Sequence, residues 1–145
     1  THERLPGAPG EAVYRMRQEE IRNAARRVRE LPWVDTDNLF LMGHDEGGDA
    51  VAEYPGTGFR ARVISGSFCA RGLRAPAGTP ILSLASTEDP WLAANPPDSC
   101  ARKAPTRSPP VVSKVLPGYL HDLSGAPDGR QAVIGFIKRH TRVRR

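Results

Sequence analysis

The stretch LFLMGHDEGG (residues 39–48) decides the fold of this 145-residue chain. Its first four residues are apolar without interruption, which is typical of a strand buried on both faces. A glycine-flanked turn follows at once, and residues 49–54 have the composition of a short helix. The sequence therefore predicts a strand, a sharp turn and a helix in direct succession.

This succession is the setting of the G-x-S-x-G nucleophile elbow, a turn that exposes one side chain at its apex. Gly43 and Gly47 have no Cβ, so the chain can turn tightly between them. Asp45 stands at the apex, where that motif has serine. Glu46 comes next, and its backbone N–H is the expected oxyanion donor. His44 is expected to pack beside the turn without a chemical role.

Apolar segments elsewhere predict three more strands, at residues 59–68, 79–86 and 111–116, and helices at residues 11–31 and 130–140. The proline-rich segment 95–110 is expected to be a long loop. Strands separated by helices or long crossovers predict an α/β fold, with a mostly parallel sheet and flanking helices. The length suits a single domain over residues 1–145.

Polar residues follow three of these strands, and the carboxyl ends of parallel strands share one edge of a sheet. Asp45 follows the first strand, Asp89 the third and His121 the fourth. Their order along the chain is that of the α/β-hydrolase triad: nucleophile, acid, histidine. His121 would be the general base and Asp89 would fix its tautomer. The alternatives are a turn-initiating Asp89 and an ordinary surface histidine.

The composition limits the classes of partner and cofactor that we expect this chain to bind. The net charge is +5, with several cations near the C-terminus. No aromatic residues alternate with them, so we expect a solvated helix end and no nucleic-acid binding. No apolar run approaches the roughly 20 residues of a membrane span. No Cys/His cluster suggests a metal site, and no cofactor is expected. Cys69 and Cys100 could both be free buried thiols.

A family resemblance rests on three stretches that occur in this order: LPWVDTDNLFLMGHDEGG, TPILSLASTEDPWL and LPGYLHDLS. Over about residues 11–140, the chain resembles the C-terminal half of dienelactone hydrolase-like α/β-hydrolases. The resemblance implies the second half of an α/β-hydrolase fold and hydrolysis of a small carboxylic ester or lactone. The resemblance also favours a disulfide between Cys69 and Cys100, and hence a periplasmic or secreted location.

The chain departs from that family in length. Members have further strands before the long helix, including the one whose loop donates an oxyanion N–H. We therefore expect either a partial domain, processed, trimmed or truncated ahead of Thr1, or a minimal relative of the family. The missing N-terminal half, or another chain, would cover the exposed edge of the sheet.

The second departure is Asp45, where members carry Ser or Cys. Asp45 could replace an esterase nucleophile; a carboxylate attacking an ester gives a high-energy anhydride, so activity would be reduced or lost. GHDEGG also resembles the GHDxGG elbow of epoxide hydrolases and haloacetate dehalogenases, in which Asp attacks a saturated carbon. Those families insert a cap domain for which residues 69–78 leave no room. A third interpretation is a non-catalytic binding or structural remnant, with Asp45 favourable at a helix N-terminus. We favour the first, with Asp45 and His121 forming an ion pair.

Overall fold

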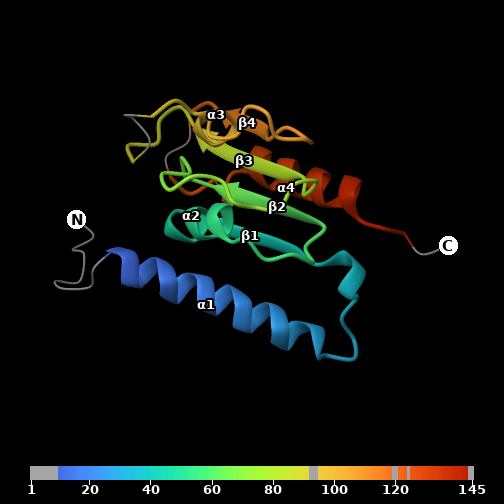
Figure 1. Ribbon diagram of the computed structural model, residues 1–145. Helices are drawn as coiled ribbons and strands as arrows, with labels where there is room; N and C mark the ends of the chain where they lie inside the picture. Colours follow the sequence, from blue (N-terminus) through green and yellow to red (C-terminus); the bar gives the residue numbers. More distant parts are fainter. Residues whose placement is uncertain (1–9, 92–94, 119–120, 124, 144–145) are drawn as a thin grey trace. The chain divides into compact units, whose positions relative to one another are not determined.

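The computed structural model describes residues 10–91, 95–118, 121–123 and 125–143 (Figure 1). It divides into two compact units, Thr1–Val34 and Asp35–Arg145, which are described separately. In the first unit the predicted helix is confirmed as α1, Gly10–Arg29. Among the described helices, none combines the length and hydrophobicity that crossing a bilayer requires.

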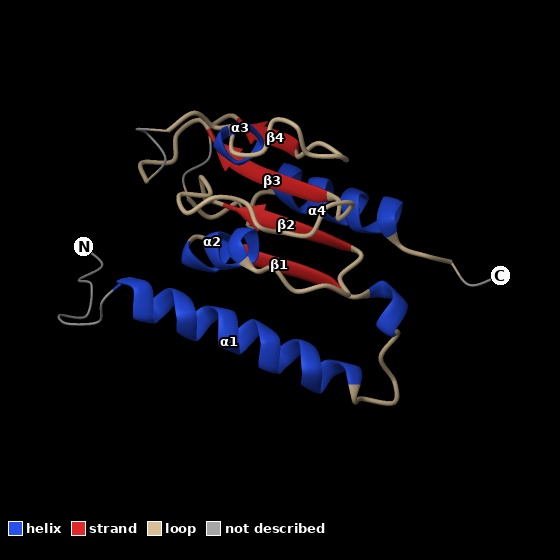
Figure 2. Ribbon diagram, viewed as in Figure 1, coloured by secondary structure: helices blue, strands red, loops and turns tan. Residues whose placement is uncertain are grey.

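The second unit is built on a four-stranded sheet with the order β1-β2-β3-β4, in which every neighbouring pair is parallel (Figure 2). The predicted fold class is therefore confirmed. The last three strands are shorter than the sequence pattern indicated, because the apolar run extends into the flanking turns, whereas the first continues two residues beyond its apolar run, to His44. The strands are β1 (Phe40–His44), β2 (Ala61–Ser65), β3 (Ile81–Ser86) and β4 (Val112–Leu116).

Helices in this unit begin earlier than predicted. α2 spans Glu46–Glu53 and starts directly after the elbow apex, and α4 spans Pro127–His140 with proline in its first turn. The turn η1 (Thr36–Asn38) precedes β1. The predicted loop 95–110 contains a short helix, α3 (Ser99–Arg102), so that part of the prediction was wrong. Cys100 anchors this helix in the core, which local sequence could not indicate.

The prediction that the first strand is buried on both faces was also wrong. Every residue of β2 and β3 is buried, whereas β1 is partly exposed and Met42 is 45% exposed. β1 lies at an edge of the sheet, with β2 as its strand neighbour. α4 packs on β2, β3 and β4.

The core has two parts, one on each face of the sheet, because alternate residues of a strand point to opposite faces. Val63 belongs to the part that includes Phe136 of α4, and Ile64 to the part that includes Val51 of α2. These two layers fix α2 and α4 against the sheet.

Arg62 of β2 is completely buried on the α2 side and holds the end of that helix. Its guanidinium donates hydrogen bonds to the backbone carbonyls of Val51, Tyr54 and Gly56. Burial, with a further contribution from the charge of Arg107, lowers the pKa of Arg62 to about 10. A cation at the C-terminal end of a helix also complements its dipole.

The predicted disulfide is present between Cys69 and Cys100, with their Cα atoms 5.1 Å apart. Both residues are buried, and the bond joins the loop after β2 to α3. The bridge therefore ties down two segments that contain little regular structure.

Replacing both cysteines with alanine should destabilise the fold. The bridge closes a loop of 31 residues, for which chain entropy gives on the order of 3–4 kcal/mol. Urea unfolding of the double variant measures the loss. Thiol titration of the denatured, unreduced protein is the control and should find no free thiol; two free thiols would contradict the bridge.

Candidate active site

Asp45 is the single residue between β1 and α2, and its backbone is strained. Its φ is 53° and its ψ is −122°, a conformation that costs a non-glycine residue on the order of 1–3 kcal/mol. The Asp45 N–H donates to the Ser65 carbonyl at 2.9 Å, and its own carbonyl accepts from the Asp49 N–H at 3.1 Å. Such strain persists where the surrounding structure enforces it, and it is common at active sites.

Glycines around the apex make this turn possible, but not the pair expected from the sequence. A Cβ on Gly43 would lie 2.1 Å from the Gly47 carbonyl oxygen, and one on Gly48 would lie 2.9 Å from the Ser67 Cβ. A Cβ on Gly47 would meet nothing within 4 Å. The strand end and the first turn of the helix therefore require Gly43 and Gly48, and the expectation for Gly47 was wrong.

Asp89 and His121 form a well-defined hydrogen-bonded pair. The Asp89 side chain is fully buried, and its Oδ2 lies 2.8 Å from His121 Nδ1. Its Oδ1 accepts a hydrogen bond from the Trp91 N–H at 2.9 Å. Because an ionised carboxylate accepts hydrogen bonds, the pair assigns the proton to Nδ1 and leaves Nε2 facing away from Asp89.

His121 Nε2 lies 3.7 Å from Asp45 Oδ2. This is beyond hydrogen-bond distance, and Nε2 is buried without a hydrogen-bond partner in the described part of the chain. The structure thus brings together the three residues that the sequence singled out, Asp45, Asp89 and His121. Glu46 is the first residue of α2, so its backbone N–H belongs to the helix start beside the apex.

The Asp45 carboxylate is 66% exposed and makes no capping hydrogen bond to α2. Side chains that stabilise a helix start usually accept such a bond from the second or third helical N–H. The contribution of the Asp45 side chain to α2 is therefore limited to its charge near the helix N-terminus.

Two aromatic rings flank His121. The His44 ring centroid lies 4.6 Å away, and that of Trp91 lies 6.2 Å away. Gly66, with a φ of 58°, passes so close that a Cβ would lie 2.7 Å from His44. Trp91 was not predicted as a site residue, although it lies only two residues after Asp89, in the loop that follows the third strand. Trp91 is 59% exposed and gives the site an apolar wall.

Asp49, on the first turn of α2, fixes the loop after β2. Its Oδ1 accepts hydrogen bonds from the Ser67 hydroxyl at 2.8 Å and from the Ala70 N–H at 3.1 Å. Burial raises the pKa of the Asp49 carboxyl, and the charge of Asp45 adds to the rise, while the two hydrogen bonds oppose it. The loop that carries Gly66 is thereby tied to the elbow helix.

The change Asp49→Asn should stabilise the protein at pH 7. A raised pKa in the folded state means that the ionised carboxylate costs folding free energy above that pKa, and that the penalty disappears below about pH 3.8. Asn keeps the acceptor oxygen without the charge. The advantage of the variant in urea unfolding should therefore shrink from pH 7 to pH 3.

Asp49→Ala is the control, and it should be less stable than the natural chain because it loses both hydrogen bonds. An Asn variant less stable than the natural chain at pH 7 would contradict the direction of the shift.

Within the described residues, no group of three or more His, Cys, Asp and Glu side chains is arranged to hold a metal ion. What the site offers is an oriented imidazole, a strained and exposed apex residue, and backbone N–H groups at a helix start. These are the parts used in nucleophilic hydrolysis.

Comparison with known proteins supports the fold. No family model and no curated protein matches the sequence. Crystal structures of SOBER1 from Arabidopsis thaliana are similar over 92% of this chain and 67% of theirs. SOBER1 itself has a TM-score of 0.61 and 18% sequence identity to this chain. One variant of SOBER1 has a TM-score of 0.63 and 17% identity, and another has a TM-score of 0.58 and 18% identity. The likeness supports an α/β-hydrolase fold and does not extend to the narrower dienelactone hydrolase-like family.

Proposed function

We propose that Asp45, His121 and Asp89 form a hydrolase-type active site in which Asp45 replaces the Ser or Cys nucleophile of an esterase or lactonase. The observation that carries the proposal is the direction of His121: its Nδ1 is held by buried Asp89, and its Nε2 faces the strained apex. The hydrolase-like fold and the resemblance to dienelactone hydrolases support the same class of reaction.

With serine at the apex, this geometry would perform acyl transfer. His121 Nε2 would take the hydroxyl proton as the oxygen attacks the ester carbon, and the Glu46 N–H would stabilise the oxyanion. Water would then hydrolyse the acyl-enzyme with the same base. The substrate would be a small ester or lactone, and this chemistry needs no cofactor.

With aspartate at the apex, the same reaction is disfavoured at two points. A carboxylate attacking an ester forms an anhydride, which is less stable than the ester it came from. The carboxylate also has no proton for His121 to remove, so His121 cannot activate it as a base activates a hydroxyl. We therefore expect little or no ester hydrolysis by the chain with Asp45.

We also propose where this protein is located and what completes its domain. A buried disulfide is compatible with an oxidising compartment, and we infer a periplasmic or secreted protein. One third of the SOBER1 chain has no counterpart here. We infer that an N-terminal half, or another chain, completes the domain and supplies further walls of the site.

The change Asp45→Ser should create esterase activity. The variant presents a neutral nucleophile to an already oriented base, whose contribution to catalysis is typically about 10²–10⁴-fold. Hydrolysis of p-nitrophenyl acetate, followed against the natural chain, measures the gain.

The matched control is Asp45→Ser combined with His121→Ala, which should lose most of that gain. Circular dichroism and thermal unfolding establish that each variant is folded. A folded Asp45→Ser protein without any gain would sink the esterase proposal and favour a binding or structural remnant.

A second candidate is nucleophilic attack by Asp45 on a saturated carbon. The observation that favours it is the exposed carboxylate, which has no capping bond to compete with attack. One carboxylate oxygen would displace a halide or open an epoxide to form an alkyl ester. Water would then attack the ester carbonyl while His121 accepts its proton, releasing the alcohol and restoring Asp45.

Mass spectrometry separates the two candidates. Under the esterase proposal, neither the natural chain nor His121→Ala should gain mass after incubation with chloroacetate or styrene oxide. The His121→Ala variant is the sensitive test because it would trap an alkyl ester that water can no longer clear. An adduct on Asp45 that accumulates in this variant and turns over in the natural chain would establish the second candidate instead.

A further inference from the structure

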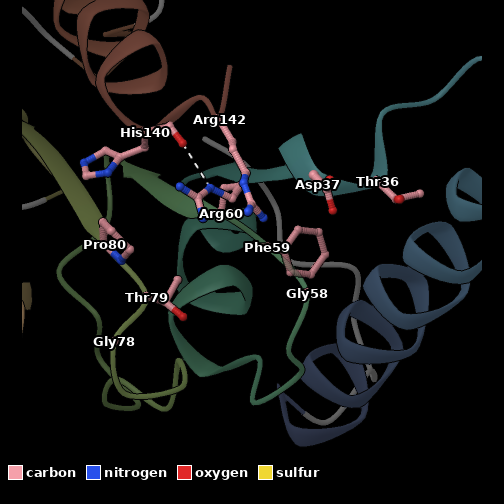
Figure 3. Close-up of a pocket in the computed structure, with 10 residues that line it drawn as sticks. All are labelled: Thr36, Asp37, Gly58, Phe59, Arg60, Gly78, Thr79, Pro80, His140 and Arg142. Atoms are coloured by element: carbon pink, nitrogen blue, oxygen red, sulfur yellow. Dashed lines mark hydrogen bonds between the residues drawn. The ribbon is translucent and has the colours of Figure 1, made fainter. Parts of the chain in front are cut away.

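A concave site lies at the opposite end of the strands from Asp45. A cavity of about 460 Å³ opens where β2 and β3 begin, between η1 and the end of α4 (Figure 3). Because all four strands are parallel, their amino ends lie together at this end of the sheet, whereas Asp45 follows the carboxyl end of β1. The cavity is therefore separate from the candidate active site.

Two arginines reach into this cavity from different elements. Arg60 precedes β2, and its Nε donates a hydrogen bond to the His140 carbonyl at 3.1 Å, as the dashed line in Figure 3 shows. Arg142 follows α4, and its backbone is fixed by Asn38, which accepts from the Arg142 N–H at 2.6 Å and donates to its carbonyl at 2.9 Å. Both side chains thus start from anchored positions.

Charge in the cavity is unbalanced. Neither the Arg60 nor the Arg142 guanidinium forms an ion pair within the described residues. Asp37 supplies one carboxylate to the lining, against two guanidiniums. Burial lowers the pKa of His140, and the nearby charges of Arg139 and Arg60 lower it further, so His140 is neutral at pH 7. The lining then carries a net positive charge together with the Thr79 hydroxyl.

We propose that this cavity binds the oxyanion group of a small molecule, a phosphate or a carboxylate. Guanidinium groups present several N–H donors in a planar fork that matches such oxygens and allows two bonds to one group. An oxyanion between Arg60 and Arg142 would remove their mutual repulsion. A concave site of this volume falls within the range for small ligands, which favours them over an extended nucleic acid.

The test uses the purified full chain, with inorganic phosphate and citrate as probes and chloride at equal ionic strength as the reference. A ligand that binds the folded state raises the midpoint of thermal unfolding with concentration. Phosphate, citrate or both should raise it above the chloride reference. The probe with the larger shift distinguishes a phosphate from a carboxylate site, and titration calorimetry gives the affinity.

Arg142→Gln is the informative variant because Arg142 contributes only backbone hydrogen bonds to the described fold. Its affinity for the phosphate or citrate probe should fall at least about tenfold. The affinity of Arg142→Lys should fall less, because lysine keeps the charge but lacks the planar guanidinium. Lys103→Gln, outside the cavity, removes the same charge and should bind as the natural chain does. Equal losses in Arg142→Gln and Lys103→Gln would overturn the proposal in favour of a diffuse basic surface. Absence of any shift beyond chloride would also overturn it.

Discussion

The contact between the end of β1 and the start of α2 is the constraint on which the site depends. Gly43 lies so close to the Gly47 carbonyl that no side chain fits between them. The chain must therefore reverse within one residue, and Asp45 is forced to a positive φ. At the other end of α2, Arg62 binds three backbone carbonyls, so the helix is fixed at both ends and cannot move to relieve the strain. The exposed position of the apex side chain is a consequence of packing, whatever residue occupies it.

The arrangement of His121 is likewise independent of the apex residue. Its orientation comes from a short hydrogen bond to a carboxylate that is itself buried and held by a backbone N–H. The contact with Asp45 is longer and involves a mostly exposed carboxylate, so water screens it strongly. The geometry of the site therefore persists without a contribution from the Asp45–His121 pair. This is the arrangement expected if another nucleophile once occupied the apex and the supporting residues stayed in place.

The features that could be predicted from the sequence were local patterns and the order in which particular residues follow one another along the chain. An apolar run, a glycine-flanked turn and the order of Asp45, Asp89 and His121 were enough for the fold class and for the meeting of these residues. Features that depend on tertiary surroundings were not predictable. The exposure of Met42 follows from the edge position of β1, and the role of Gly48 from the approach of the loop after β2. Arg60 and Arg142 are 82 positions apart, and only the meeting of strand starts with the end of α4 brings them into one cavity.

The two ends of the parallel strands, called here the carboxyl edge and the amino edge, differ in charge. This difference bears on which ligands each can bind. The carboxyl edge holds an exposed Asp45 carboxylate, with Asp49 close enough for Asp45 to raise its pKa. An anionic substrate such as a haloacid would be repelled there, whereas a neutral ester, lactone or epoxide would not. The amino edge, with Arg60 and Arg142, has the opposite preference. On electrostatic grounds, the side of Trp91 and His121 therefore suits the uncharged ester or lactone proposed for it, and the cavity at the far end of β2 and β3 suits the oxyanion proposed for it.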